Sequence, residues 1–309
     1  MLLRISIGSL DLLKNLETRM VSRPSTFYLL QFSEKGCLAR CTFCAQSHIN
    51  KYCAEKLGRI TWPVIGLSEL LEKKDVVKNN FSRICVQSVF KRGFEKEILL
   101  IVKSLKNFGL PISVAINPVS TPVLKELRRN RVDYLGIGLD VVSKKLFEKL
   151  KKPFRWADYV DFIERAIEVF GKRKVFVHII VGLGEREDEV LMLFETFVDI
   201  GANIALFPLV SYDKHYRVVP SKNYYRKMQV LAYLVNKNLD LEEYVTLERG
   251  KIVFKKRVEE RMLLESVLTQ GCPGCNRPFY TEGPLNIYNY PSFNMALQDK
   301  NKIKEEAQW

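Results

Sequence analysis

The chain has 309 residues, of which 47% are apolar and 27% are charged. This composition is typical of a globular protein and excludes a disordered or collagen-like chain. The length suits one large domain with appendages or two small domains. Lysine and arginine (49) outnumber aspartate and glutamate (35), so the formal net charge is +14. Because the basic residues are interspersed with glutamates, we interpret the charge as a solvated surface, with an acidic protein partner as the second interpretation.

Neither a membrane nor nucleic acid is expected as a partner. The sequence has no apolar run of about eighteen residues, and Arg4, Asp11 and Lys14 interrupt the N-terminal segment, which has no small-residue cleavage site. It also has no arginine-rich block and no basic stripe interleaved with aromatic residues. Seven cysteines, an odd number at close spacing, favour metal binding in a reducing compartment over a disulfide framework. We therefore expect a cytoplasmic protein that binds metal.

Short runs of β-branched and aromatic residues alternate with helical patterns along the middle of the chain. The predicted strands are 27–32, 83–87, 112–116, 134–138, 175–181, 203–209 and 244–248. The predicted helices are 67–79, 95–108, 121–130, 143–151, 157–170, 187–200 and 222–237. Repeated strand–helix units with nearly continuous apolar strands indicate parallel pairing with both faces covered. The expected fold is therefore α/β, a full or partial (β/α) barrel.

The barrel is expected to span residues 26–255. A helical extension (1–25) precedes it, and a tail (256–309) with a helix and a C-x2-C pair follows it. In such barrels the chemistry lies at the carboxyl ends of the strands. The first predicted strand leads into SEKGCLARCTFC, and later strands end at CVQSVF, GIGLD, VGLGE and FPLV. We therefore expect a single functional site on this rim.

Cys37, Cys41 and Cys44 form a C-x3-C-x2-C pattern on the loop after the first predicted barrel strand. Thiolates normally ligate every iron of a 4Fe-4S cluster, so three cysteines leave one iron open. S-adenosylmethionine (SAM) can chelate an open iron through the amino and carboxylate groups of its methionine moiety. The alternatives are three unrelated buried thiols or a structural zinc site, which requires a fourth ligand such as His48.

This spacing, with Phe43 before the third cysteine, resembles the signature of the radical SAM superfamily. The resemblance covers most of the chain, and CTFCAQSHINKY is similar to the corresponding loop of biotin synthase. It implies a radical SAM barrel and a SAM-binding 4Fe-4S cluster on Cys37, Cys41 and Cys44. It also implies that SAM is cleaved reductively to a 5′-deoxyadenosyl radical, with Phe43 part of the cofactor site.

The same resemblance implies which residues of the fourth and fifth strand ends contact SAM. Asp140 in GIGLD resembles the aspartate that holds the ribose hydroxyls, and Gly138 allows close approach. HIIVGLGE resembles the segment that lies near the adenine, where Gly182 and Gly184 permit close contact.

Two further segments complete the implied SAM site. Phe207 and Leu209 in FPLV resemble the stretch whose backbone hydrogen-bonds the adenine. Gln87 and Ser88 stand where the family usually has Gly-Gly-Glu, and they remain candidates for contacts to the methionine amine. Biotin synthase has an arginine for the SAM carboxylate where this chain has Val160, so that role is unassigned.

Cys85, Cys272 and Cys275 form a second candidate set. RICVQSVFKR resembles the stretch of biotin synthase that supplies one ligand of its sulfur-donating cluster, and the tail provides C-x2-C in GCPGCNRPFY. We expect an auxiliary iron–sulfur cluster, of the 4Fe-4S type, on these three cysteines if the tail folds back over the rim. Its fourth position is open: Cys53 completes it or is an ordinary core thiol, and a serine or an open iron is also compatible. The alternatives are a zinc half-site or a redox pair, with Cys85 an ordinary buried residue.

The tail sequence GCPGCNRPFYTEGPLNIYNYP resembles a biotin-synthase-related subgroup that includes the archaeal-type two-protein lipoyl synthases. The resemblance implies a sulfur-insertion enzyme that adds sulfur to a protein-bound octanoyl chain. It implies an octanoylated lipoyl carrier domain or peptide, a paralogous radical SAM protein and a low-potential electron donor as partners. No catalytic side chain is assigned beyond the cluster ligands. The alternatives are biotin synthase acting on dethiobiotin, a radical SAM mutase or lyase, and a non-enzymatic protein that binds zinc and nucleic acid.

Overall fold

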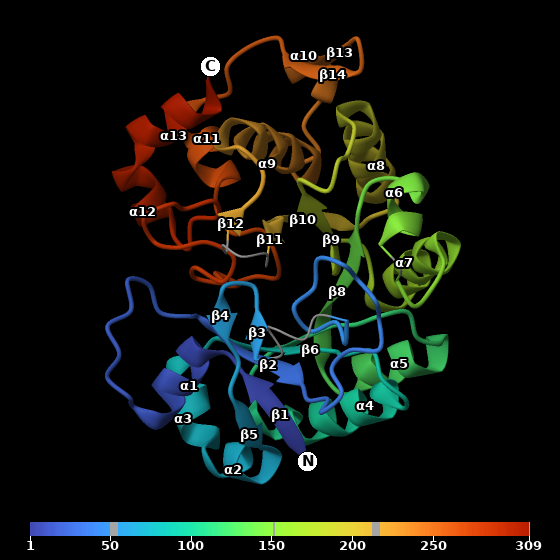
Figure 1. Cartoon of the computed structure of the whole chain (residues 1–309), viewed down its shortest axis with the longest axis vertical. Coiled ribbons are helices and arrows are strands. Elements are labelled where there is room, and N and C mark those ends of the chain that lie inside the picture. Colours follow the sequence, from blue (N-terminus) through green and yellow to red (C-terminus); the bar gives the residue numbers. More distant parts are fainter. Residues whose placement is uncertain (50–54, 151, 212–216, 309) are drawn as a thin grey trace.

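The computed structural model describes residues 1–49, 55–150, 152–211 and 217–308. Its centre is an eight-stranded sheet in which six neighbouring strands run parallel (Figure 1). These strands are β2 (Thr26–Gln31), β6 (Arg83–Gln87), β7 (Ile112–Ala115), β8 (Val132–Asp140), β9 (Val175–Val181) and β10 (Asn203–Pro208). In the described part of the chain the sheet ends at β10 on one side and at β5 on the other. The expected α/β (β/α) barrel is therefore confirmed in its partial form.

The parallel strands are buried because helices cover the outer face of the sheet, while the inner face lines the barrel interior. Figure 1 shows α4, α5, α7 and α8 arranged around the outside of these strands. The helices are α1 (Ile7–Lys14), α2 (Leu67–Glu72), α3 (Lys74–Asn80), α4 (Phe94–Leu105), α5 (Thr121–Arg129), α6 (Lys144–Lys149), α7 (Trp156–Phe170), α8 (Glu187–Asp199), α9 (Lys222–Asn236), α10 (Leu241–Tyr244), α11 (Glu260–Ser266), α12 (Phe293–Gln298) and α13 (Lys300–Ala307).

The helices predicted between residues 67 and 237 are confirmed, with two local differences; residue 151, the last of the helix predicted at 143–151, lies outside the described residues. The segment predicted as one helix at 67–79 is divided into α2 and α3 at Lys73, whose φ of −96° and ψ of 20° leave the helical region. The end of the helix predicted at 95–108 is a 3₁₀ turn over Lys106–Phe108. The apolar periodicity that predicted these helices also supplies their buried faces.

The N-terminal segment differs from the expected helical extension. Within residues 1–25 only α1 is helical, and Leu2–Ile5 forms strand β1. β1 pairs antiparallel with β2 and with β5 (Val64–Gly66), so the sheet continues beyond the parallel strands. A short apolar segment such as Leu2–Ile5 becomes a strand because β2 offers it an unpaired edge, and that partner is distant in sequence.

In the part of the chain that the structure describes, three short antiparallel pairs lie outside the main sheet. They are β3 (Lys56–Leu57) with β4 (Ile60–Thr61), β11 (Val210–Ser211) with β12 (Arg217–Val218), and β13 (Val245–Glu248) with β14 (Lys251–Phe254). The strand predicted at 244–248 is thus present as β13, but it belongs to a separate hairpin and not to the barrel.

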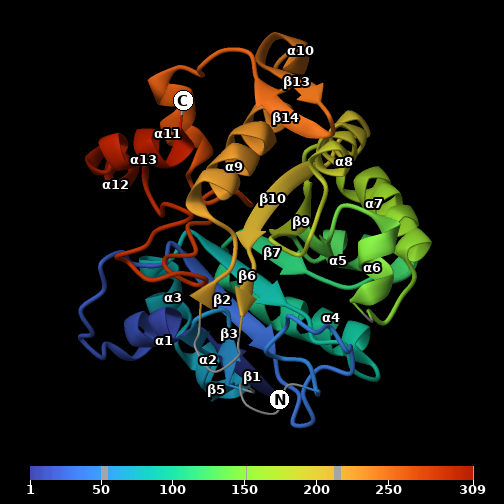
Figure 2. The ribbon, with the colours of Figure 1, turned by 45° about the horizontal axis from the view of Figure 1, so that its top comes forward.

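The tail packs against α9 and has a small apolar core of its own. This core includes Val230 and Leu234 of α9 and Leu263, Tyr290 and Ile303 of the tail. Figure 2 shows α11, α12 and α13 grouped beside α9. Among the described helices, none is long and apolar enough to cross a membrane.

Candidate active site

The cysteine loop lies at the carboxyl end of β2 and is held by its own backbone. The Cys37 N–H donates to Gln46 O (2.7 Å), and the His48 N–H donates to Cys37 O (2.9 Å). The Leu38 N–H donates to Phe90 O (2.8 Å), in the segment that follows β6. The loop is therefore fixed on the rim of the barrel, where the sequence predicted it.

The three thiols of this loop lie near one another. The pKa of Cys41 is raised to about 12, mainly by burial; Lys152 opposes this rise, and Asp140, Cys44 and Cys37 contribute to it. Burial also raises the pKa of Cys44 to about 11, with a contribution from Cys37. Iron ligation removes the protons of coordinating thiols, so these high pKa values describe the metal-free site. Three neighbouring thiols on one loop fit a 4Fe-4S cluster with one open iron.

The zinc alternative depends on His48 as a fourth ligand. No group of three or more His, Cys, Asp or Glu side chains there is arranged to hold a single metal ion. His48, the conceivable zinc ligand, is exposed, and its Nδ1 lies 3.0 Å from Cys37 O. Its ring is therefore associated with the backbone of the loop.

Asp140, at the end of β8, forms an ion pair with Lys152. The Lys152 side chain is 4% exposed, and its Nζ also donates to Gly138 O and lies 4.7 Å from the centroid of the Tyr159 ring. Burial disfavours the Lys152 ammonium, but Asp140, Tyr159 and Cys41 together raise its pKa above the usual value. Lys152 therefore carries a buried positive charge beside the cysteine loop.

The glycines predicted at the SAM site permit close approach between parts of the chain itself. A Cβ at Gly138 would lie 3.2 Å from Asp140 Oδ1. Gly182 has a φ of +109°, and its Cβ would lie 3.3 Å from Leu209 Cβ. The Leu209 N–H donates to Val181 O (2.9 Å). Gly184 is exposed, and a Cβ at this position would meet no atom within 4 Å.

Gln87 and Ser88 follow each other at the end of β6 but have different surroundings. The Ser88 N–H donates to Ala115 O (2.8 Å), and its Oγ accepts from Asn117 Nδ2 (3.4 Å). The Gln87 side chain faces the barrel interior. The contacts of both residues to SAM stay predictions.

A single cavity of about 250 Å³ inside the barrel brings most of the predicted site together. We call it the inner cavity. Its wall includes two groups of predicted residues: Phe43, Cys44, Gln87, Asp140, Phe207 and Leu209 from the cluster and SAM site, and Cys85, Cys272 and Cys275 from the second set. Cys37, Cys41, Ser88, Gly138 and Gly182 are not part of this wall. Much of the remaining wall is apolar or aromatic, with Tyr28, Trp62, Val114 and Ile180 among its residues.

Cys85, Cys272 and Cys275 come together from two distant parts of the chain. Burial raises the pKa of Cys85 well above its usual value, and Cys275 and Cys272 raise it further. Burial raises the pKa of Cys272 to about 11, opposed by a hydrogen bond with Ser113. Cys275 Sγ lies 3.3 Å from Tyr28 Oη. Cys53, the conceivable fourth ligand, lies outside the described residues.

The tail reaches the inner cavity at the amino ends of the strands and not over the rim as expected. The Ser25 N–H donates to Asn276 Oδ1 (3.0 Å), and Arg83 Nε donates to Pro273 O (3.1 Å). Ser25 directly precedes β2, and Arg83 is the first residue of β6. Because these bonds anchor the C-x2-C turn there, the two cysteine sets lie toward opposite ends of the inner cavity.

Sequence reasoning missed Lys152 and two other charged or titratable residues of the site. His178 and Arg277 line the inner cavity. The pKa of His178 is lowered to about 3, mainly by burial and in part by Arg277 and Lys152, so this imidazole is neutral. His178 and Ile180 lie two residues apart on β9, so both side chains point to the same face of the strand, and both line the cavity. This two-residue repeat could have identified His178 from the sequence. No local pattern identifies Lys152 or Arg277.

A family model of the radical SAM superfamily matches residues 34–197, more than half of the chain. The chain belongs to the radical SAM superfamily. Membership implies a 4Fe-4S cluster and SAM as cofactors, and the three cysteines of the loop fit that cluster. No curated protein sequence matches the chain.

Solved structures with similar folds include two of HydG, a maturase of the [FeFe]-hydrogenase. One gives a TM-score of 0.55 at 12% identity, covering 84% of this chain and 66% of that one. HydG from Carboxydothermus hydrogenoformans gives 0.51 at 15% identity, covering 84% and 60%. Methylornithine synthase PylB gives 0.47 at 15% identity, covering 65% and 58%. The chain thus spans 58% to 66% of the lengths of these proteins, and at such identities the likeness concerns the fold alone.

Proposed function

We propose that this chain is a radical SAM enzyme that inserts sulfur into an acyl chain, as a component of a lipoyl synthase. The observation that carries the proposal is the shared inner cavity, whose wall includes Cys44 and Asp140 as well as Cys85, Cys272 and Cys275. A substrate carbon in this cavity would be near both the site of radical formation and a sulfur source. Holding reacting groups together in one enclosed space accelerates such a reaction.

In this proposal the residues of the rim bind and orient the cofactors. Cys37, Cys41 and Cys44 hold the 4Fe-4S cluster, Asp140 binds the ribose hydroxyls, and Lys152 neutralises the SAM carboxylate, the role left open at Val160. When bound, the cluster supplies the electron that cleaves SAM to methionine and a 5′-deoxyadenosyl radical. The walls of the inner cavity exclude water and stray hydrogen donors, which would consume that radical.

The second set supplies the sulfur. Cys85, Cys272 and Cys275 would hold the auxiliary cluster, which would supply sulfide to the substrate. At each substrate carbon a C–H bond breaks and a C–S bond forms. The hydrogen atom leaves on 5′-deoxyadenosine, and the auxiliary cluster, when bound, would accept the remaining electron. The neutral His178 adds no charge to the space in which this exchange takes place.

An alkyl chain suits the apolar part of the inner cavity. This part of the wall is formed by Tyr28, Trp62, Val114 and Ile180. Their side chains can pack against methylene groups but provide few hydrogen bonds for a polar ring. The proposed substrate is an octanoyl chain on the lysine of a lipoyl carrier domain or peptide. A paralogous radical SAM protein and a low-potential electron donor are proposed as further partners.

The proposal is tested first by composition. Protein reconstituted anaerobically should contain two clusters, and Cys272→Ala/Cys275→Ala should contain one while still producing 5′-deoxyadenosine. Cys37→Ala, Cys41→Ala and Cys44→Ala should each abolish 5′-deoxyadenosine. If wild-type protein binds a single cluster, a radical SAM mutase or lyase becomes the better proposal. Colourless protein with stoichiometric zinc would instead support the non-enzymatic alternative.

The reaction is tested by incubating the protein and its paralogue with SAM, reductant and an octanoyl-lysyl peptide. Mass spectrometry should show sulfur addition to the peptide. A parallel reaction with dethiobiotin separates biotin synthase from lipoyl synthase. SAM turnover with no mass gain on either substrate would overturn the sulfur-insertion proposal.

A further inference from the structure

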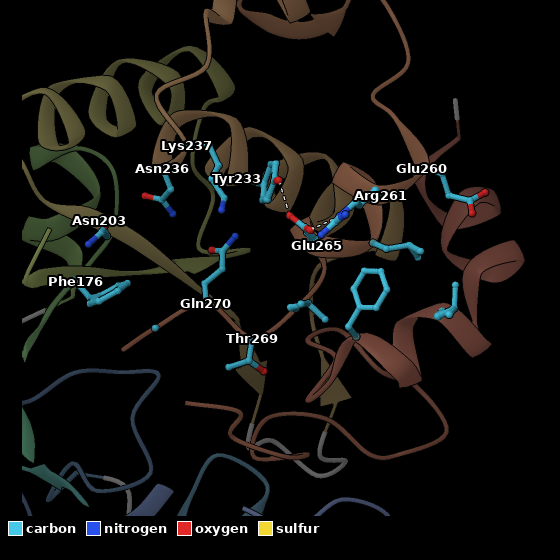
Figure 3. A pocket seen from close by; sticks show the side chains of 15 residues that line it. Phe176, Asn203, Tyr233, Asn236, Lys237, Glu260, Arg261, Glu265, Thr269 and Gln270 are labelled. Atoms are coloured by element: carbon cyan, nitrogen blue, oxygen red, sulfur yellow. Dashed lines mark hydrogen bonds and ion pairs between the residues drawn. The ribbon is translucent and has the colours of Figure 1, made fainter. Parts of the chain in front are cut away.

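A second hollow lies on the outside of the barrel, between α9, α11 and α12 and the first residues of β9 and β10 (Figure 3). We call it the outer cleft. Its volume is about 920 Å³. Tyr233 and Lys237 of α9 line one side, and Arg261 and Glu265 of α11 line another. The cleft takes no part in the SAM site described above.

The outer cleft and the inner cavity are separated by one short segment. Gln270 and Gly271 line both hollows, and the next residue is Cys272 of the second cysteine set. Gly271 has no side chain to thicken this wall. A group lying in the outer cleft at Gly271 is therefore adjacent to the proposed sulfur source.

The wall contains an unsatisfied hydrogen-bond acceptor. Gln270 Oε1 is shielded from solvent and has no hydrogen-bond partner in the described residues. Figure 3 shows the Gln270 side chain directed toward Asn236 and Lys237. Asn236 is held in another direction: its Oδ1 accepts from the Ile204 N–H (2.8 Å), and its Nδ2 donates to Ile204 O (2.9 Å). Leaving such an acceptor unpaired costs about 1–3 kcal/mol, so a ligand with an N–H donor would be favoured here.

The rest of the cleft combines apolar surface with a preformed polar rim. Phe293 and Leu297 lie four residues apart on α12, are 36% and 44% exposed, and line the cleft. On the rim, Tyr233 Oη donates to Glu265 (2.7 Å), and Arg261 Nε donates to the same carboxylate (2.9 Å). Such a surface suits an aliphatic arm extending from a peptide.

The charge of the chain also indicates what kind of protein would dock. Four charged residues line the cleft: Lys237, Arg261, Glu260 and Glu265. Glu265 pairs with Arg261 and Glu260 pairs with Lys304, whereas Lys237 has no carboxylate within ion-pair distance in the described residues. The whole chain has a formal net charge of +14. An acidic carrier domain is therefore electrostatically complementary to this protein.

We propose that the outer cleft admits the acylated lysine of an acidic carrier domain to the inner cavity. The lysine arm lies along Leu297 and Phe293, the amide N–H donates to Gln270 Oε1, and the alkyl chain passes beside Gly271 toward Cys272. The inference rests on the proposed function, because it describes how the substrate of that reaction would pass from the outer cleft into the inner cavity. It places the amide at the wall, where the unsatisfied acceptor lies.

Binding tests this route without requiring turnover. A fluorescently labelled octanoyl-lysyl peptide is titrated with reconstituted holoenzyme and SAM, and its anisotropy gives the affinity. Gln270→Leu removes the acceptor and should weaken binding about tenfold, the effect of losing one hydrogen bond of about 1.4 kcal/mol. Leu297→Glu should also weaken binding. Leu285→Glu is the matched control, because Leu285 is 92% exposed, does not line the cleft and should leave the affinity unchanged.

A peptide whose acyl amide is N-methylated separates the hydrogen bond from general damage. This peptide has no N–H to donate, so wild-type protein and Gln270→Leu should bind it equally. The inference is overturned if wild-type protein does not bind the octanoyl-lysyl peptide, or if Gln270→Leu and Leu297→Glu bind it as wild type does.

Sulfur addition is measured by mass spectrometry in the same samples. Binding that depends on Gln270 and Leu297, without sulfur addition by wild-type protein, would support the outer cleft as a docking route and overturn the proposed reaction. The two proposals therefore fail in different measurements.

Discussion

Lys152 and Asp140 form an ion pair at the carboxyl end of β8, with side chains that are 4% and 15% exposed. Asp140 has a φ of +73°, a left-handed conformation that is unfavourable for a residue with a side chain. Such conformations persist where the surrounding structure holds them in place, often at functional sites. The ion pair fixes the Asp140 carboxylate beside the cysteine loop, where the predicted ribose contact requires it.

Replacing Lys152 with methionine should destabilise the protein by about 3 kcal/mol. Removing one partner of a buried pair leaves the other charge uncompensated, which costs about 3–5 kcal/mol, and the partial exposure of Asp140 favours the lower value. Anaerobic denaturant unfolding measures the change. Lys149→Met, on the exposed face of α6, is the control and should be nearly neutral. Equal losses in both variants would contradict a specific role for the pair.

The contribution of Lys152 should not depend on pH in the neutral range. Its pKa is raised in the folded protein, since Asp140, Tyr159 and Cys41 outweigh burial. A raised lysine pKa contributes stability that is fully present below the unfolded value of about 10.4 and is lost only as the pH rises through the folded value. The stability difference between wild-type protein and Lys152→Met should therefore be constant from about pH 6 to pH 9.

Gly136→Ala should destabilise the barrel by about 1–3 kcal/mol, the usual cost of overpacking. A Cβ at this position would lie 2.6 Å from His178 Cε1, inside the inner cavity. The imidazole cannot withdraw freely, because its ring centroid lies 5.0 Å from that of Phe207. Combining Gly136→Ala with His178→Ser should recover most of the loss measured by denaturant unfolding. Gly283→Ala, with no atom within 4 Å, is the control and should have little effect.

His178 should make the protein less stable as the pH falls. Burial lowers the folded pKa of His178 to about 3, whereas the unfolded value is about 6.5. The unfolded state therefore binds a proton that the folded state rejects, and stability decreases below about pH 6.5 by up to about 1.4 kcal/mol per pH unit. His178→Gln should lose less stability than wild-type protein between pH 7 and pH 5. Parallel losses in the two proteins would show that His178 is not the group responsible.

Arg83→Met should release the C-x2-C turn while sparing the first cysteine set. The Arg83 side chain is 6% exposed, pairs with Asp133 and donates to Pro273 O, beside Cys272. We expect the reconstituted variant to lose about half of its iron and to retain 5′-deoxyadenosine production, since the cysteine loop lies at the other end of the strands. Arg92→Met, an exposed substitution after β6, should keep the full iron content. Loss of SAM cleavage in Arg83→Met would contradict this separation of the two sets.

The local pattern of apolar residues was sufficient to predict the strands and helices of the barrel. The six parallel strands and the helices between them were predictable because each buried face repeats with a period that depends only on neighbouring residues. Strand β1 was not predictable, since Leu2–Ile5 extends only by pairing with β2 and β5. The strand at 244–248 was predictable as an element, but nothing in its sequence indicated that it pairs with β14 and stays outside the barrel.

The sequence alone determined the class of the protein, because the C-x3-C-x2-C loop is a local motif whose ligand spacing lies within eight residues of chain, Cys37 to Cys44. Only the tertiary structure decided which distant groups join it. It placed Lys152 against Asp140, brought Cys272 and Cys275 to Cys85 at the amino ends of the strands, and set Gln270 between the two hollows. The positions of Cys272, Cys275 and Gln270 depend on how the tail packs against α9 and the amino ends of the strands, and that packing is the sum of many weak contacts between segments far apart in sequence.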